Sequence, residues 1–144
     1  MGDLYVGSSG QKLSFVFDTG SVWTWIPLSE CQTCSRMGME LYAEKESETY
    51  ARLEDSVQVV KYGESSAYGY FSKEMICLKE KPQLFTPPRQ MQLQDSANTE
   101  QTPEHHETTS CINNFKMLSV IKIEGLSGLM SDGVVGLAPT AQRT

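Results

Sequence analysis

A series of short β-prone runs, separated by turn residues, constrains the fold of this chain more than any other feature of its sequence. The runs occupy residues 4–6, 13–17, 22–26, 57–62, 68–71, 75–78, 115–123 and 134–138. Most are rich in Val, Ile, Phe, Tyr or Leu, as strands are, and glycine- and serine-rich segments act as turns between them. No long amphipathic pattern is present, and only residues 37–45 are expected to hold a short helical turn. The sequence therefore predicts an all-β fold with little helix.

The size and charge of the chain narrow the possible functions. Its 144 residues are enough for one domain with a core, and we treat 1–144 as a single unit. The formal net charge is -6 and no basic patch is visible, which argues against nucleic acid as a partner. No apolar stretch approaches the roughly 20 residues that span a bilayer, and the first residues do not form a signal peptide.

Residues 79–110 differ in character from the rest of the chain. They hold four of the six prolines together with many Gln, Glu and Thr residues, and few large apolar side chains. This composition predicts a solvated loop, because it offers too little apolar surface to pack a core. Strand signals resume on both sides, so we interpret the segment as a polar insertion within one domain.

The cysteines indicate two disulfides. They are Cys31, Cys34, Cys77 and Cys111, and four cysteines allow three pairings. We favour Cys31–Cys34, which are neighbours in sequence, and Cys77–Cys111, which would close the base of the insertion. A redox pair would place its CxxC at a helix start in a βαβ unit, and a zinc site would need more ligands, for which His105 and His106 are the only candidates. We therefore expect structural disulfides, with no metal and no cofactor.

Asp18 is the residue that points most directly to chemistry. It follows the apolar run 15–17 and precedes Thr19, Gly20 and Ser21. An ionised carboxylate in such a place needs hydrogen bonds, which the two hydroxyls and the flexible glycine backbone can supply. A sheltered acid surrounded by donors is suited to acid–base catalysis, although the tripeptide alone is more typical of a strand-to-turn cap.

Three further motifs set Asp18 in a wider pattern. Trp25 lies a few residues downstream, Tyr62-Gly63 lies at an expected hairpin tip, and 132–137 reads Asp-Gly-Val-Val-Gly-Leu. In this order and spacing the motifs resemble the amino-terminal lobe of pepsin-like aspartic proteases, from about residue 4 to 139, with the insertion as the main gap. The resemblance implies one lobe of the bilobal acid-protease β-barrel fold and an aspartic endopeptidase activity.

The resemblance also implies a role for individual residues. Asp18 matches the catalytic aspartate, one of two carboxylates that together activate water to attack a peptide bond. Tyr62 and Gly63 match the flap, a β-hairpin that closes over peptide substrate, and the Trp25 indole matches the donor to the flap tyrosine. The residues that match the support of the active-site turn are Thr19, Gly20, Ser21 and Gly136. We expect Asp18 and Tyr62 to face one cleft, with Gly136 packed against the Asp18 turn.

The sequence departs from the family pattern at the flap and in the number of catalytic motifs. Ser65 stands where a glycine is usual, and Glu64 adds a charge near the hairpin tip. More important, no second Asp-Thr-Gly or Asp-Ser-Gly occurs, and Asp132 does not replace it because it belongs to the supporting element. The chain alone is therefore expected to be inactive.

Three explanations for the single aspartate remain open. We favour a truncated product whose carboxyl-terminal lobe carries the partner aspartate; the others are a homodimer of the retroviral type and an inactive peptide-binding relative. A non-enzymatic β module with two disulfides is the competing class. The resemblance implies peptide or protein substrates, the missing lobe or a second copy as partner, and a vacuolar, lysosomal or secreted location.

Overall fold

The computed structural model describes residues 1–80 and 110–139. Nearly all of the expected insertion, including His105 and His106, therefore lies outside the described residues. Within them, no helix is long and apolar enough to cross a membrane.

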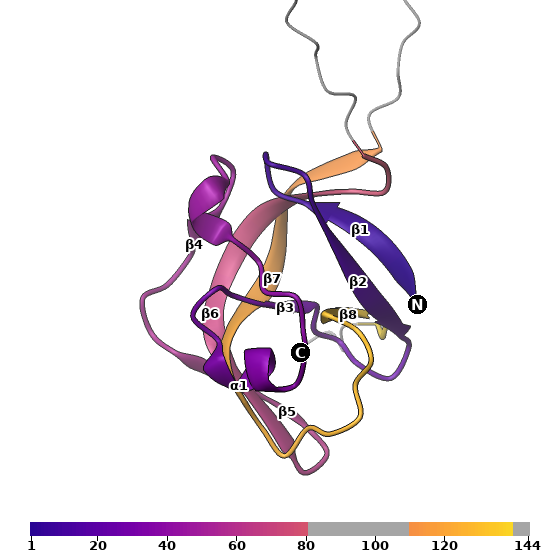
Figure 1. Ribbon diagram of the computed structural model, residues 1–144, viewed down its shortest axis with the longest axis vertical. Coiled ribbons are helices and arrows are strands. Elements are labelled where there is room, and N and C mark those ends of the chain that lie inside the picture. The colour runs from indigo at the N-terminus through magenta and orange to yellow at the C-terminus, as the bar shows by residue number, and fades with distance from the viewer. Residues whose placement is uncertain (81–109, 140–144) are drawn as a thin grey trace, which may run out of the picture.

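Strands dominate the described part of the chain (Figure 1). They are β1 (Gly2–Val6), β2 (Gln11–Asp18), β3 (Trp25–Pro27), β4 (Ala51–Arg52), β5 (Gln58–Tyr62), β6 (Ser65–Cys77), β7 (Cys111–Glu124) and β8 (Gly133–Gly136). Two short helices accompany them, α1 (Gln32–Arg36) and the 3-10 turn η1 (Glu44–Glu46). The predicted all-β class with little helix is confirmed, and the mixed sheet is that of one acid-protease lobe.

The strands form one sheet that closes on itself. Its order is β1-β2-β8-β3-β7-β6-β4, with β5 paired to β6, and β1 also pairs with β6. The long curved arms β6 and β7 run antiparallel through the middle of the molecule (Figure 1). The return of β1 to β6 turns the sheet into a barrel, which removes most free edges.

Alternating apolar residues fill the inside of this barrel. Leu13 and Phe15 of β2 are buried at 1% and 0% exposure, while their neighbours along the strand face outward. They pack in one cluster with residues of β1 and β3, including Val6 and Ile26. A second cluster surrounds Trp25 and contains β7 and hairpin residues. The two clusters hold β2, β3 and β8 in place behind the candidate site.

Three predicted strands differ from the structure. Only the end of the run 22–26 pairs in a strand, as β3. Before it the backbone forms single hydrogen bonds outside the strand ladders: the Ser21 carbonyl accepts from the Ala138 N–H and the Thr24 carbonyl from the Leu118 N–H. The sequence predicts separate strands at 68–71 and 75–78, but the first run and the second up to Cys77 lie in the continuous strand β6. The expected helical turn of 37–45 overlaps only the start of η1, and α1 lies earlier than predicted.

The structure contains the two favoured disulfides, Cys31–Cys34 and Cys77–Cys111. The second joins register partners at the ends of β6 and β7. The first corrects one argument from the sequence, because the CxxC does begin a helix: Cys31 caps α1, and its sulfur accepts from the Cys34 N–H at 3.3 Å. Both residues are 0% exposed, so burial rather than the lack of a helix start separates this pair from an accessible redox disulfide.

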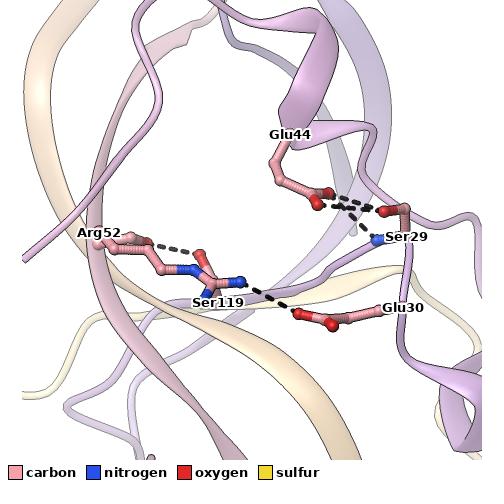
Figure 2. A network of polar contacts seen from close by, with 6 residues as sticks. Ser29, Glu30, Glu44, Arg52 and Ser119 are labelled. Atoms are coloured by element: carbon pink, nitrogen blue, oxygen red, sulfur yellow. Dashed lines mark hydrogen bonds and ion pairs between the residues drawn. The ribbon is translucent and has the colours of Figure 1, made fainter. Parts of the chain in front are cut away.

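Polar contacts fix the segment between β3 and β4 (Figure 2). The buried Glu44 carboxylate accepts from the Ser29 hydroxyl at 3.0 Å and from the Ser29 N–H at 3.4 Å. Arg52 pairs with Glu30 at 3.2 Å and lies over the Tyr70 ring at 3.8 Å. These contacts tie the segment to β4 and β6.

Candidate active site

Asp18 is the last residue of β2, where the strand leaves the barrel. It is half-buried, and the following Thr19 and Gly20 are exposed. Its Oδ1 atom accepts the Gly20 N–H at 2.9 Å, which closes a tight turn around the carboxylate. The turn thus holds the acid at the mouth of the sheet and orients it with a backbone donor.

Gly136 supports this turn from behind. β8 runs parallel to β2 with Asp18 paired to Gly136, and the Leu137 N–H donates to the Asp18 carbonyl at 2.8 Å. A Cβ on Gly136 would lie 2.6 Å from the Trp23 nitrogen and 2.8 Å from the Ser21 carbonyl oxygen. Backbone this close leaves no room for a side chain, so the glycine is required for the turn and β8 to meet.

Thr24 is a supporting residue that the sequence analysis missed. It is 6% exposed, and its hydroxyl accepts the Gly136 N–H at 3.2 Å. A threonine between Trp23 and Trp25 reads as an ordinary β-former, and only its burial reveals the hydrogen bond. The hydroxyl adds a second link between β8 and the loop that follows Asp18.

Asp132 has a structural position. Its carboxylate accepts from the Ser14 N–H at 2.8 Å, the Ser14 hydroxyl at 2.9 Å and the Glu40 N–H at 2.8 Å. Three donors from two other segments bind this acid within the fold. Asp132 therefore fastens the approach to β8 and is not presented to a substrate.

Asp18 and Tyr62 line the same cavity, which has a volume of about 160 Å³. Asp18 is the only carboxylate among its lining residues, and most of the others are apolar. The lining residues are Val16, Asp18, Trp25, Tyr62, Ser65, Ser66, Ala67, Ile123, Leu126, Leu129 and Val134. A small apolar space beside one acid and one phenol suits an uncharged side chain next to a polar bond.

The hairpin of β5 and β6 brings Tyr62 over the cavity. The chain reverses at Gly63, which has φ 58, and Ser65 pairs with Tyr62. The Ser65 hydroxyl also donates to the Gly125 carbonyl at 3.0 Å. The residue that replaces the usual flap glycine thus anchors the hairpin base to the loop after β7.

The environment of Tyr62 raises the pKa of its phenol to about 12. Burial is the largest cause and the negative charge of Asp18 the next, while contacts with Trp25 and Ser21 act in the opposite direction. The phenol is therefore neutral over the whole acid range and remains a hydrogen-bond donor there.

The hydrogen bonds expected of Trp25 and Ser21 fall outside hydrogen-bond geometry, although both side chains lie close enough to Tyr62 to lower its pKa. The Tyr62 hydroxyl donates to the backbone carbonyl of Trp23 at 3.2 Å, and the Trp25 Nε1 atom is buried without a partner in the described part of the chain. The Ser21 hydroxyl is likewise buried without a partner among the described residues and does not bond Asp18. The hydrogen bond to the Asp18 carboxylate comes instead from the Gly20 N–H.

No group of three or more His, Cys, Asp or Glu side chains gathers into a metal site among residues 1–80 and 110–139. The candidate site is thus built from one carboxylate, one phenol, buried polar groups and apolar walls. Its chemistry rests on the acid.

Comparisons with known proteins place these features in a family. The family described as eukaryotic aspartyl protease matches residues 1–141. Plasmepsin I of Plasmodium falciparum is 32% identical over 77 residues, which cover 54% of this chain and 17% of that protein. Cyprosin of Cynara cardunculus is 32% identical over 78 residues (54% and 16%). A vacuolar aspartic protease of Candida albicans is 28% identical over 76 residues (53% and 18%). Each match spans less than a fifth of the relative's own length.

Proposed function

Because this chain belongs to the eukaryotic aspartyl protease family, we propose that it supplies Asp18 as one of the two catalytic carboxylates of an aspartic endopeptidase. The observation that carries the proposal is the convergence of Asp18 and Tyr62 on one largely apolar cavity. The parallel pairing of β2 with β8 holds Asp18 there, which favours a fixed catalytic geometry.

The chemistry of Asp18 requires a second carboxylate. In such a pair one ionised acid takes a proton from water while the other, protonated, donates to the carbonyl oxygen of the peptide bond. In the described residues Asp18 accepts one hydrogen bond, at Oδ1, so Oδ2 is available to a water molecule. Tyr62 and Gly63 act as the flap, and Thr19, Gly20, Ser21, Trp25 and Gly136 act as supports of the site.

The surface around the Asp18 turn favours a second aspartate-bearing lobe as the partner. Phe17, Val22 and Leu137 are 43%, 45% and 53% exposed. Apolar side chains gathered beside a catalytic acid mark a surface that another unit covers. The much greater length of the matched relatives supports a second lobe over a second copy of this chain.

A vacuolar, lysosomal or secreted location fits this function. Two disulfides indicate an oxidising compartment, and one matched relative is named as vacuolar. Fractionation of the native protein tests the location; recovery in the cytosol with reduced cysteines would contradict it.

A peptide-cleavage assay at acid pH, with and without pepstatin, tests the proposed activity. The chain is assayed over a range of concentrations and beside a longer product that carries a second lobe. Pepstatin-sensitive activity confined to the longer product supports the two-lobe enzyme. Activity of the chain that rises more steeply than its concentration identifies a homodimer, and a folded longer product without activity identifies an inactive relative.

Replacement of Asp18 by Asn is the decisive variant in that assay. It keeps the size of the side chain but removes the acid, so we expect a loss of activity of at least about 10³-fold with the fold intact. Asp55→Asn, an exposed acid in the loop before β5, is the matched control and should retain activity. Retained activity in Asp18→Asn would exclude its catalytic role.

A further inference from the structure

Trp23 joins the loop after Asp18 to the strand that continues from the flap. Its indole stacks on Phe71 of β6, with ring centroids 4.9 Å apart and planes inclined by 18°. Neither side chain belongs to the cavity lining, and Trp23 is 36% exposed. The pair therefore lies beside the candidate site and outside it.

The backbone of Trp23 contacts the two other parts of the site. Its carbonyl oxygen accepts the Tyr62 hydroxyl at 3.2 Å, and both its nitrogen and its oxygen lie against Gly136. One residue thus meets the flap through its carbonyl, β8 through its backbone and β6 through its ring. Among the residues that the structure describes, this carbonyl is the one acceptor that the Tyr62 hydroxyl reaches.

The stack restrains the position of Trp23, because the loop around it lacks regular strand pairing. Residues 22–24 are not in a strand. The backbone carbonyls of Ser21, just before this loop, and of Thr24, at its end, accept hydrogen bonds from Ala138 and Leu118. An offset aromatic pair contributes about 0.5–1.5 kcal/mol beyond its buried area and fixes the orientation of both rings. A ring fixed on β6 also fixes the peptide group to which it is attached.

We propose that Trp23 is a positioning residue for the flap tyrosine: its stack on Phe71 fixes the carbonyl oxygen that holds the Tyr62 hydroxyl at the Asp18 cavity. The effect on catalysis rests on the proposed function, whereas the effect on the hairpin does not. The Trp25 indole is a donor only, so it cannot replace this carbonyl as the acceptor of the phenol proton. The rise in the Tyr62 pKa agrees with a phenol held in a buried position near Asp18.

Amide hydrogen exchange of the flap tests the positioning without any need for activity. The variants are Trp23→Leu and Phe71→Leu, which remove the stack, and Trp23→Phe, which keeps it. Met130→Ala, at a residue that is 84% exposed and outside both the stack and the cavity lining, is the control. Loss of one neutral hydrogen bond is worth about a three- to tenfold change in an opening equilibrium, so residues 61–66 should exchange that much faster in the two leucine variants.

The exchange rates are read in this chain, with the β6–β7 amides as an internal standard. Unchanged exchange of 61–66 in both leucine variants would overturn the proposal, as would equal acceleration in Met130→Ala. If Trp23→Leu fails to fold, Phe71→Leu and Trp23→Phe still separate the stack from overall stability. Wild-type exchange in Trp23→Phe is expected.

Steady-state kinetics per titrated active site test the consequence for catalysis. We expect kcat/KM to fall about three- to tenfold in either leucine variant, the double variant to be no worse than the single ones, and Trp23→Phe to recover activity. A purely structural role would lower the number of active sites but leave kcat/KM per site unchanged, and that result would overturn the positioning role. If the wild-type protein has no activity at all, the proposed function fails while the exchange data still decide the placement of Tyr62.

Discussion

Gly136 shows at the scale of a single residue why the site needs a backbone without a side chain. In Gly136→Ala the new methyl group would meet backbone atoms of Trp23 and Ser21 at 2.6–2.8 Å, none of which belongs to a flexible side chain. We expect a loss of about 1–3 kcal/mol in the free energy of unfolding, together with a loss of activity because the Asp18 turn must shift. Urea denaturation and the peptide-cleavage assay measure both quantities.

Gly10→Ala serves as the comparison for that variant. Gly10 has φ 68, but a methyl group added there would meet nothing within 4 Å, so the substitution adds only backbone strain. Stability should fall while activity per folded molecule stays normal. An active Gly136→Ala enzyme would show that close packing of β8 on the Asp18 turn is not needed.

A buried acid remote from the cavity forms a second residue-scale feature. Glu74 is 0% exposed and accepts hydrogen bonds from the Tyr42 hydroxyl at 2.5 Å, from the Met75 N–H at 2.6 Å and from the Thr49 hydroxyl. Tyr42→Phe leaves this carboxyl with one donor fewer, and we expect a cost of about 1–3 kcal/mol in urea denaturation. Tyr68→Phe removes the exposed contact to Glu124 and should change stability little; equal effects would contradict the role of burial.

The raised tyrosine pKa values predict how stability depends on alkaline pH. Folding raises the pKa of Tyr62 from 10.0 to about 12, and burial also raises the pKa of Tyr42. Each folded phenol holds its proton more tightly than the unfolded one, so this stabilisation is complete below pH 10 and is lost as pH rises toward the folded pKa. In urea midpoints measured between about pH 10 and pH 12, Tyr62→Phe should show a shallower decline than the wild type. Identical slopes would refute the shift.

At the scale of elements, the sequence predicts most strands but not their continuity. It predicts two runs, 68–71 and 75–78, in place of β6, because the polar residues 72–74 separate them. In the structure Ser72 and Glu74 are both 0% exposed within the one strand. In the structure the register shifts between Tyr68 and Gly69, and a Cβ at Gly69 would collide with the Ser119 carbonyl oxygen. The glycine marks a close approach of β7 within one strand, a tertiary cause that local pattern does not reveal.

In the candidate site, too, the sequence predicts some features and only the folded chain reveals others. Motifs with fixed spacing relate Asp18, Tyr62 and Gly136 in the sequence, and the structure places them around one turn and cavity. The partner of the Tyr62 hydroxyl is not predictable in this way, because any residue has a backbone carbonyl and only the path of the loop selects that of Trp23. Residue types can be read from sequence, whereas backbone acceptors depend on the folded loop.

The Cys77–Cys111 disulfide allows a prediction for the β6–β7 pair. It closes a loop with a sequence separation of 34 at the register-matched ends of the two strands. Such a cross-link restricts the unfolded chain, so Cys77→Ala/Cys111→Ala should lower the free energy of unfolding by about 2–4 kcal/mol. Amide exchange should accelerate first near Ile76 and Ile112. Unchanged stability would mean that the strand ends are held by their ladder alone.

At the scale of the whole molecule, the barrel is closed but one face remains open. β1 returns to β6, so most strand edges are paired, yet Phe17, Val22 and Leu137 stay exposed beside the Asp18 turn. The core has no need of these side chains, because its two clusters are complete without them. Under the proposed function, a fixed geometry at Asp18 and an uncovered apolar face serve one purpose, the docking of a unit that brings the second acid.

The open face predicts the solution behaviour of the chain by itself. Without a partner, its apolar side chains should drive self-association at micromolar concentrations, and Phe17→Ser/Leu137→Ser should reduce it without loss of the fold. Val59→Ser, at a residue that is 50% exposed on β5, is the matched control and should associate like the wild type. Light scattering and sedimentation velocity measure the effect. In the longer product that carries a second lobe, the same double variant should lower activity, because it disturbs the contact between the lobes. Two results together would show that this face docks nothing: a wild-type chain that stays monomeric, and a double variant that keeps its activity.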